Sequence, residues 1–146
     1  MMLSYSKWTL LWLIWIVFIL MVGILPLNNF VGHSHWQYIK WVPTQEQLHA
    51  PLIVLDLFTD VLANILLFVP FGFLHIFRLQ GRKGSYATLL VLAVILSGGI
   101  ELYQVYCHNR STSLLDLIDN VAGALVGMHL ALKWKEKERH GELAVS

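Results

Sequence analysis

Long apolar stretches alternate with short polar ones along this chain. Four of the apolar stretches are long enough to cross a bilayer as helices, which takes about 20 residues each. They lie at about residues 8–27, 52–77, 86–107 and 114–134. We therefore predict an all-α, polytopic membrane protein with four transmembrane helices, forming one domain over residues 1–146. A polar tail at residues 135–146 is expected to fray.

Composition supports this class. Hydrophobic residues make up 57% of the chain and charged residues 13%, and the mean hydropathy is +0.63. Average globular proteins are about 45–50% apolar and about 25% charged. The net charge of +1 is too small to indicate a nucleic-acid partner. The single cysteine, Cys107, excludes an intramolecular disulfide and is interpreted as a small apolar residue near a helix end.

Polar side chains interrupt the second apolar stretch at helical spacing. Asp56, Asp60 and Asn64 follow one another at i, i+4 and i+8, and Phe68 and Gly72 continue the same stripe. Each polar group would cost several kcal/mol in an apolar environment unless it met a partner or a pocket of water.

The later part of the chain offers partners for this stripe. Glu101 and Gln104 end the third apolar stretch, Arg110 follows in the polar link, and Asp116 and Asn120 begin the fourth. We expect these groups to meet the second helix at one membrane-embedded site. As binding residues of that site we predict Asp60, Asn64, Glu101, Gln104, Arg110, Asp116 and Asn120.

The sequence contains a proline and two glycines that are expected to affect helix packing. Pro70 removes a backbone hydrogen bond in the second half of its helix and is expected to kink it. Gly123 and Gly127 form a G-x-x-x-G pattern, which is typical of closely packed membrane helices.

The first apolar stretch carries Trp8, Trp12 and Trp15. Tryptophan is enriched at membrane interfaces, so the three rings are interpreted either as interfacial anchors or as a packing face. The stretch is too long for the apolar core of a signal peptide, so we interpret it as an uncleaved transmembrane helix.

The link after it contains His33, His35 and His49. This spacing could suggest a metal site, but no cysteine or well-spaced carboxylate completes a coordination sphere. We interpret the link as a solvated loop and expect neither a metal nor a cofactor.

Basic residues predict the orientation in the membrane. They gather before the first stretch, after the second and after the fourth, at Lys7, at Arg78, Arg82 and Lys83, and at Lys133, Lys135, Lys137 and Arg139. The other two links hold only Lys40 and Arg110. Cytoplasmic loops are rich in Lys and Arg, so both termini are expected in the cytoplasm and the polar site in the outer half of an inner membrane.

Intramembrane polar residues can also act only as interhelical hydrogen bonds, worth roughly 0.6–2 kcal/mol each. That alternative suits Asn64 and Gln104. It suits Asp56, Asp60, Glu101 and Asp116 less well, because Arg110 is the one cation near them in sequence. Such acids indicate a functional site, holding protons or lining a cavity open to the outside.

These motifs carry a family resemblance. DVLANILLFVPFG in the second stretch, E-x-x-Q in the third, and R-x-x-S-x-x-D-x-x-x-N-x-x-G-x-x-x-G look like the VanZ-like family of small bacterial membrane proteins, over roughly residues 50–132. The resemblance implies a four-helix membrane protein. The namesake is associated with low-level resistance to the glycopeptide teicoplanin, and relatives occur in cell-envelope and exopolysaccharide settings.

The resemblance also assigns motif positions. They are Asp60, Asn64, Phe68, Pro70, Gly72, Glu101, Gln104, Arg110, Asp116, Asn120, Gly123 and Gly127. Asp56 and Asp119 match no such position. Many relatives have a Lys and a His before the second span, and Lys40 and His49 are loose counterparts of these.

Several functions are compatible with the pattern. The first is binding of a membrane lipid, a lipid-linked glycan precursor or a glycopeptide, with Arg110 contacting a phosphate or carboxylate. The second is an enzyme of the cell envelope with Asp60 and Glu101 as general acid and base. Proton or ion movement is a third. A fourth is an assembly role with protein partners in polysaccharide synthesis, through the face of Gly123 and Gly127.

Overall fold

The computed structural model describes residues 2–39, 51–79, 82, 84–108, 110 and 112–145. Four long helices follow in chain order: α1 (Met2–Ile24), α3 (Pro51–Leu79), α4 (Ser85–Gln104) and α5 (Leu114–Val145). Two short 3-10 helices, η1 (Leu27–Asn29) and η2 (Trp36–Tyr38), lie in the first link. The described residues form no strand beyond an isolated antiparallel bridge between Phe30 and Cys107.

The helices confirm the predicted fold class. Within the described residues, four helical segments are long and apolar enough to cross a membrane: Lys7–Ile24, Pro51–Leu79, Ser85–Gln104 and Leu114–His140. The protein is therefore an all-α, multi-pass membrane protein. The third helix ends at Gln104, earlier than the expected residue 107.

Residues 135–145, which the sequence expected to fray, are helical, because α5 continues through Val145. Lys and Glu favour helix, and side chains four residues apart support one another there. The Trp134 indole N–H donates to the Glu138 carboxylate at 2.7 Å, and the His140 ring lies 3.9 Å from the carboxylate of Glu136.

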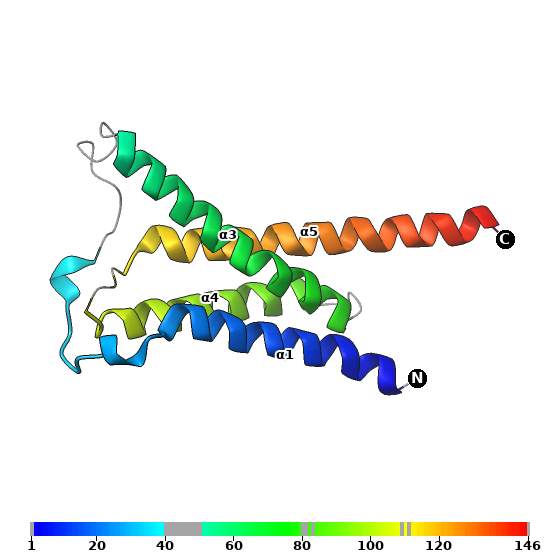
Figure 1. The fold of residues 1–146 in the computed structure, drawn as a ribbon. Coiled ribbons are helices and arrows are strands. Elements are labelled where there is room, and N and C mark those ends of the chain that lie inside the picture. Colours follow the sequence, from blue (N-terminus) through cyan, green and yellow to red (C-terminus); the bar gives the residue numbers. More distant parts are fainter. Residues whose placement is uncertain are drawn as a thin grey trace.

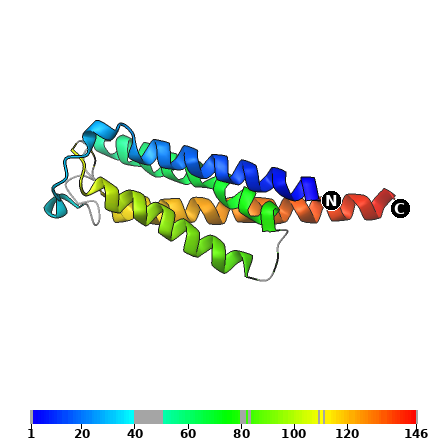
Figure 2. The same ribbon diagram turned by 90° about the horizontal axis from the view of Figure 1, so that it is seen from below.

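The bundle has two distinct ends (Figure 1). Both termini lie at one end, which we call the termini end. The opposite end, the loop end, carries η1, η2 and the link from α4 to α5. Helix α3 crosses α5 and diverges from α1 and α4 toward the loop end, while Figure 2 shows α4 spreading away from α5 toward the termini end.

Glycines allow α3 and α5 to make the closest helix contact of the bundle. A Cβ at Gly123 would meet the backbone carbonyl of Ile65, and one at Gly127 the carbonyl of Val69. From the other side, a Cβ at Gly72 would meet the carbonyl of Ala124. The glycine pattern of α5 therefore faces α3, and α3 itself runs as one helix through Pro70.

Aromatic side chains fill the centre. Trp12 is 5% exposed and stacks on Phe71, with ring centroids 5.5 Å apart, and the Arg78 guanidinium lies 3.9 Å from the centre of the Trp12 ring. The Trp15 indole N–H donates to the Leu67 carbonyl at 2.9 Å. Of the two interpretations of the tryptophans, the packing face therefore holds for Trp12 and Trp15.

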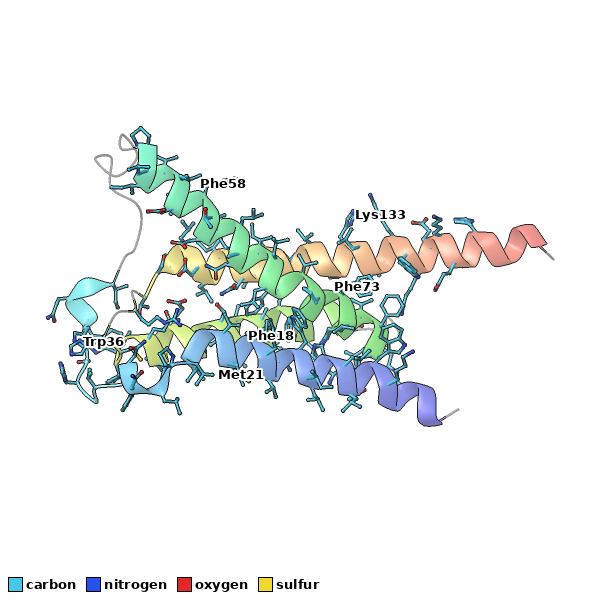
Figure 3. All side chains as sticks on the ribbon, viewed as in Figure 1. Phe18, Met21, Trp36, Phe58, Phe73 and Lys133 are labelled. Atoms are coloured by element: carbon cyan, nitrogen blue, oxygen red, sulfur yellow. The ribbon has the colours of Figure 1, made fainter. Side chains whose placement is uncertain are left out.

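Many large apolar side chains instead face outward. Phe18 and Met21 on α1 and Phe58 on α3, labelled in Figure 3, are all more than 40% exposed. In a water-soluble protein such surfaces would aggregate, whereas in a membrane they face acyl chains.

Candidate functional site

A cavity of about 280 Å³ lies between the helices, and all four long helices contribute to its wall. Its polar lining residues are Asp60, Asn64, Glu101, Gln104, Arg110, Asp116 and Asn120. Its remaining lining residues are Ile19, Val22, Gly23, Ala63, Leu67, Phe68 and Ile100. The structure thus brings together, in one cavity, all seven residues that the sequence singled out as ligands.

The α4 wall is anchored by hydrogen bonds. Glu101 is 9% exposed, and its carboxylate accepts the backbone N–H of Ser113 at 2.8 Å. Its backbone carbonyl accepts the Thr112 hydroxyl at 3.1 Å. The end of α4 and the start of α5 are therefore held together at the cavity wall. Gln104 donates to the carbonyl of Gly23 at 3.2 Å and ties α4 to α1.

Arg110 comes from the link between α4 and α5. Its Nη2 donates to the carbonyls of Leu25 at 2.8 Å and Val22 at 3.3 Å, near the end of α1. These carbonyls have no helical partner further along the chain, so the guanidinium caps the helix while remaining exposed. The contacts hold a fixed positive charge at the cavity.

The α5 wall carries Asp116 and Asn120. Asn120 is 5% exposed, and its side-chain N–H₂ donates to the Ser97 hydroxyl of α4 at 2.9 Å. Its side-chain oxygen is buried without a hydrogen-bond partner among the described residues. An unpaired buried amide oxygen can accept a hydrogen bond from water or from a bound molecule.

Helix α3 supplies Asp60, Asn64 and Phe68. Asp60 is exposed, Asn64 is half-buried and Phe68 is fully buried. Along this helix the wall therefore changes from charged to apolar, and the Phe68 ring closes its inner part. Asp56, one turn earlier, is exposed and does not line the cavity, although the sequence grouped it with the other acids.

Charge in the cavity is mixed. Three carboxylates, of Asp60, Glu101 and Asp116, share it with the guanidinium of Arg110. A polar molecule entering it would meet acceptors on three helices and one fixed cation. Such a wall suits a head group that combines hydroxyl or amine donors with one anionic group.

The remaining motif residues position this wall. Gly72, Gly123 and Gly127 lie at the α3–α5 contact and line no part of the cavity, and neither does Pro70. The sequence assigned structural roles to all four, and the three glycines lie where the backbones of α3 and α5 touch.

Sequence reasoning missed the contribution of α1. Ile19, Val22 and Gly23 line the cavity, yet nothing distinguishes them from other apolar residues of that helix. It also missed Ser97, whose partner Asn120 was recognised. A serine within an apolar run was the available signal for Ser97.

A second group of polar side chains lies at the loop end. His33 and His35 meet His108, and their ligand atoms lie within 4.8 Å of one another. The sequence paired the first two with His49, which, like Lys40, lies outside the described residues.

A comparison with known protein families shows which family this chain belongs to. A sequence model of the VanZ/LLP1 family matches residues 8–135. The chain belongs to the VanZ/LLP1 family. The match is longer than the expected 50–132 and includes α1, in agreement with the contribution of α1 to the cavity wall.

Family membership confirms the resemblance stated from the motifs. A search of curated proteins finds no match, and a search of solved structures finds none. VanZ/LLP1 membership therefore gives this chain a family, and its function has to be argued from the cavity.

Proposed function

We propose that this VanZ/LLP1 protein binds the polar head group of an envelope amphiphile in the cavity between its helices. The amphiphile class is a lipid-linked glycan precursor or a related lipid, with a glycopeptide as the other candidate. The observation that carries the proposal is the convergence of seven polar side chains from α3, α4, α5 and the α4–α5 link on one cavity within a membrane bundle.

Cavity size supports a head group as the bound part. Small-molecule pockets hold about 300–1,000 Å³, and this cavity of about 280 Å³ is at the lower limit. A sugar or phosphate fits such a volume, whereas a long acyl or prenyl chain does not. The chain would lie outside, against the exposed apolar surface of the helices.

Roles follow from the chemistry of each side chain. Arg110 contacts the phosphate or carboxylate of the head group, since a guanidinium fork matches these anions. Asp60, Glu101 and Asp116 accept hydrogen bonds from hydroxyl or amine groups.

Orientation in the membrane is part of the proposal. The basic residues of three long helices lie toward the termini end of the bundle (Figure 1). They are Lys7 in α1, Arg78 in α3, and Lys133 and the basic residues after it in α5. By the positive-inside tendency this end faces the cytoplasm of a bacterial inner membrane. The loop end then faces outward, where glycan precursors and glycopeptide antibiotics are met, so a role in glycopeptide resistance or exopolysaccharide processes is consistent with it.

The binding test uses purified full-length protein in nanodiscs and a short-chain polyprenyl diphosphate carrying N-acetylglucosamine, with teicoplanin as the second probe. Replacing Arg110 by alanine removes a charge-assisted contact and is expected to weaken binding by about 10- to 100-fold. Arg110→Lys should restore part of this loss, because the ammonium keeps the charge without the fork.

Controls separate lost chemistry from lost structure. Asp60→Asn changes an exposed side chain of the cavity wall, and Glu101→Gln keeps an acceptor for the Ser113 N–H, so both variants should fold as the parent. Lys133→Ala removes an exposed charge on α5, on the far side of the bundle from the loop that carries Trp36 (Figure 3). Equal binding by the parent, Arg110→Ala and Asp60→Asn would contradict the proposal.

An envelope enzyme is the second candidate. Asp60 and Glu101 line the same cavity, and this observation favours it. Asp60 is exposed and Glu101 is almost buried, and a general acid and a general base require such different environments. Turnover of the sugar diphosphate probe by the parent, abolished in Glu101→Gln while binding persists, would favour the enzyme over the binding protein.

An assembly role remains a weaker alternative. The face of Gly123 and Gly127 was its expected contact surface, and that face is covered by α3. A partner in polysaccharide synthesis would have to dock on another surface.

A further inference from the structure

Three histidines gather at the loop end although they come from two separate links. His33 and His35 follow α1, and His108 follows α4. Their ring centroids are 4.8 Å apart for His33 and His35, 5.7 Å for His33 and His108, and 5.2 Å for His35 and His108. One nitrogen from each ring lies within 4.8 Å of the others, which is close enough for one ion to be shared after small rotations.

Backbone pairing holds the two links in register. The N–H of Val31 donates to the carbonyl of Tyr106 at 3.0 Å, and the N–H of His108 donates to the carbonyl of Asn29 at 2.8 Å. The N–H of His35 donates to the carbonyl of Val105 at 2.9 Å. These backbone hydrogen bonds therefore fix the positions of the two links that carry the histidines.

Glycine makes the turn between these pairings. Gly32 has φ +76°, in the left-handed region, where a side chain would be strained. The chain turns there immediately before His33. The turn brings His33 and His35 to the same side as His108.

One ring is already oriented as a ligand would be. The Nδ1 of His35 lies 3.2 Å from the carbonyl of Val105, and as a donor there it leaves Nε2 with the lone pair. Metal-binding histidines commonly donate their second ring N–H to a carbonyl in this way, which fixes the tautomer and the ring plane.

The residues around the three rings favour a transition-metal ion. A hollow of about 510 Å³ beside the rings is lined by His33, Ser34, His35, Gln37, Cys107, His108 and Arg110. No carboxylate of the described residues lines it, so calcium and magnesium lack their preferred oxygen ligands. Imidazole nitrogens suit zinc, nickel and copper.

Cys107 does not belong to the ligand set. Its side chain is buried, and its Sγ lies 3.5 Å from the carbonyl of Tyr103 within the last turn of α4. The thiol therefore points to the helix backbone, and the three imidazoles remain as protein ligands.

We propose that His33, His35 and His108 bind a divalent transition-metal ion, Zn²⁺ in the first instance, at the loop end. The remaining coordination position is open to solvent, since His33 and His108 are exposed. The three histidines do not line the head-group cavity, although Arg110 lines both that cavity and the hollow beside the rings. The metal site is proposed independently of the proposed function. The sequence argued against a metal because no cysteine or well-spaced carboxylate completes a coordination sphere with His33, His35 and His49, whereas the fold brings His108 from the link after α4.

The test uses tag-free, full-length protein, purified in detergent and stripped of metal with a chelator. Titration with Co²⁺, followed by visible absorption, should show one ion per chain in a nitrogen-rich, low-symmetry site, and Zn²⁺ should displace it. Loss of one of three ligands in His108→Ala or His33→Ala should weaken Zn²⁺ binding by roughly 100-fold. Both side chains are exposed, so these variants should fold as the parent.

Matched histidines supply the controls. His129→Ala and His140→Ala change exposed histidines on α5 and should bind Zn²⁺ as the parent does. His49→Ala removes the histidine that the sequence grouped with His33 and His35, and this variant should also bind Zn²⁺ as the parent does. Zn²⁺ binding that is unchanged in His108→Ala, or that is lost in His49→Ala but kept in His108→Ala, would overturn the proposal.

Discussion

Asn120 joins two helices and also lines the cavity. Its amide N–H₂ donates to Ser97 of α4, and its oxygen is buried without a hydrogen-bond partner among the described residues. Glu101 divides its roles in a similar way, since one carboxylate oxygen holds the Ser113 N–H while the side chain lines the cavity. At this scale, the hydrogen bonds that join the helices also orient the groups that face the cavity.

The Asn120–Ser97 bond can be tested by stability. Ser97→Ala leaves the buried amide N–H of Asn120 without this acceptor and should lower the free energy of unfolding by about 1 kcal/mol, the usual range for hydrogen bonds between membrane helices. Thermal or denaturant unfolding in detergent measures it. Thr59→Ala is the control, because its exposed hydroxyl bonds only to the Leu55 carbonyl of its own helix. An equal loss in both variants would contradict a specific interhelical bond.

Individual residues were the part of the site that the sequence predicted best. Intramembrane Asp, Glu, Asn and Gln are conspicuous in apolar runs, because each has to be compensated there. The six predicted binding residues of these types line the cavity, and Arg110 of the polar link lines it too. Asp56, one turn nearer the N-terminal end of α3, does not. Ile19 and Val22 could not be predicted, since an apolar residue that lines a cavity has the same sequence signature as one that faces lipid.

At the scale of elements, the cavity depends on how α3 crosses α5. The two helices touch through glycines, so their backbones come close at the middle and the helices diverge toward the loop end (Figure 1). Bulky residues at the crossing would separate them along their whole length. The close crossing and the open loop end are therefore two aspects of one packing arrangement.

Gly127→Ala tests this crossing. The added methyl group would meet the Val69 carbonyl, which is backbone and cannot move aside, so a loss of about 2 kcal/mol or more in unfolding free energy is expected. Gly98→Ala on α4 is the matched control, because no atom lies within 4 Å of its added Cβ, and it should unfold within about 1 kcal/mol of the parent.

Gly23→Ala refines the comparison. Its methyl group would meet the side chain of Ile100, which can rotate, so its cost should fall between those of Gly98→Ala and Gly127→Ala. Unfolding in the same detergent ranks the three variants. A Gly127→Ala protein as stable as Gly98→Ala would show that the α3–α5 contact is looser than described.

Element boundaries were less predictable than element number. Hydropathy located the four spans, yet it placed the end of the last one at residue 134, and α5 continues to Val145. Hydropathy reports where a helix leaves the membrane, whereas Lys and Glu continue a helix in water. The meeting of His108 with His33 and His35 was also beyond the sequence, because it depends on which links share one end of the bundle.

The whole molecule is a four-helix bundle with exposed apolar side chains on its outside and a polar cavity between its helices. We propose that this cavity holds water and opens outward. The exposed apolar surface and the match to the VanZ/LLP1 family support the membrane placement. The water content and the sidedness of the cavity are the central claim, because the proposed head-group site requires both.

Thiol labelling in intact cells tests that claim most directly. In a Cys107→Ser background, Ala63→Cys places a thiol on the cavity wall, and Val91→Cys places one on α4 at a position 57% exposed toward lipid. A membrane-impermeant maleimide should label the Ala63→Cys protein from outside and leave the Val91→Cys protein unlabelled, since thiolates form only in contact with water. An Ala63→Cys protein that reacts only after the cells are opened, or not at all, would contradict an outward-facing aqueous cavity.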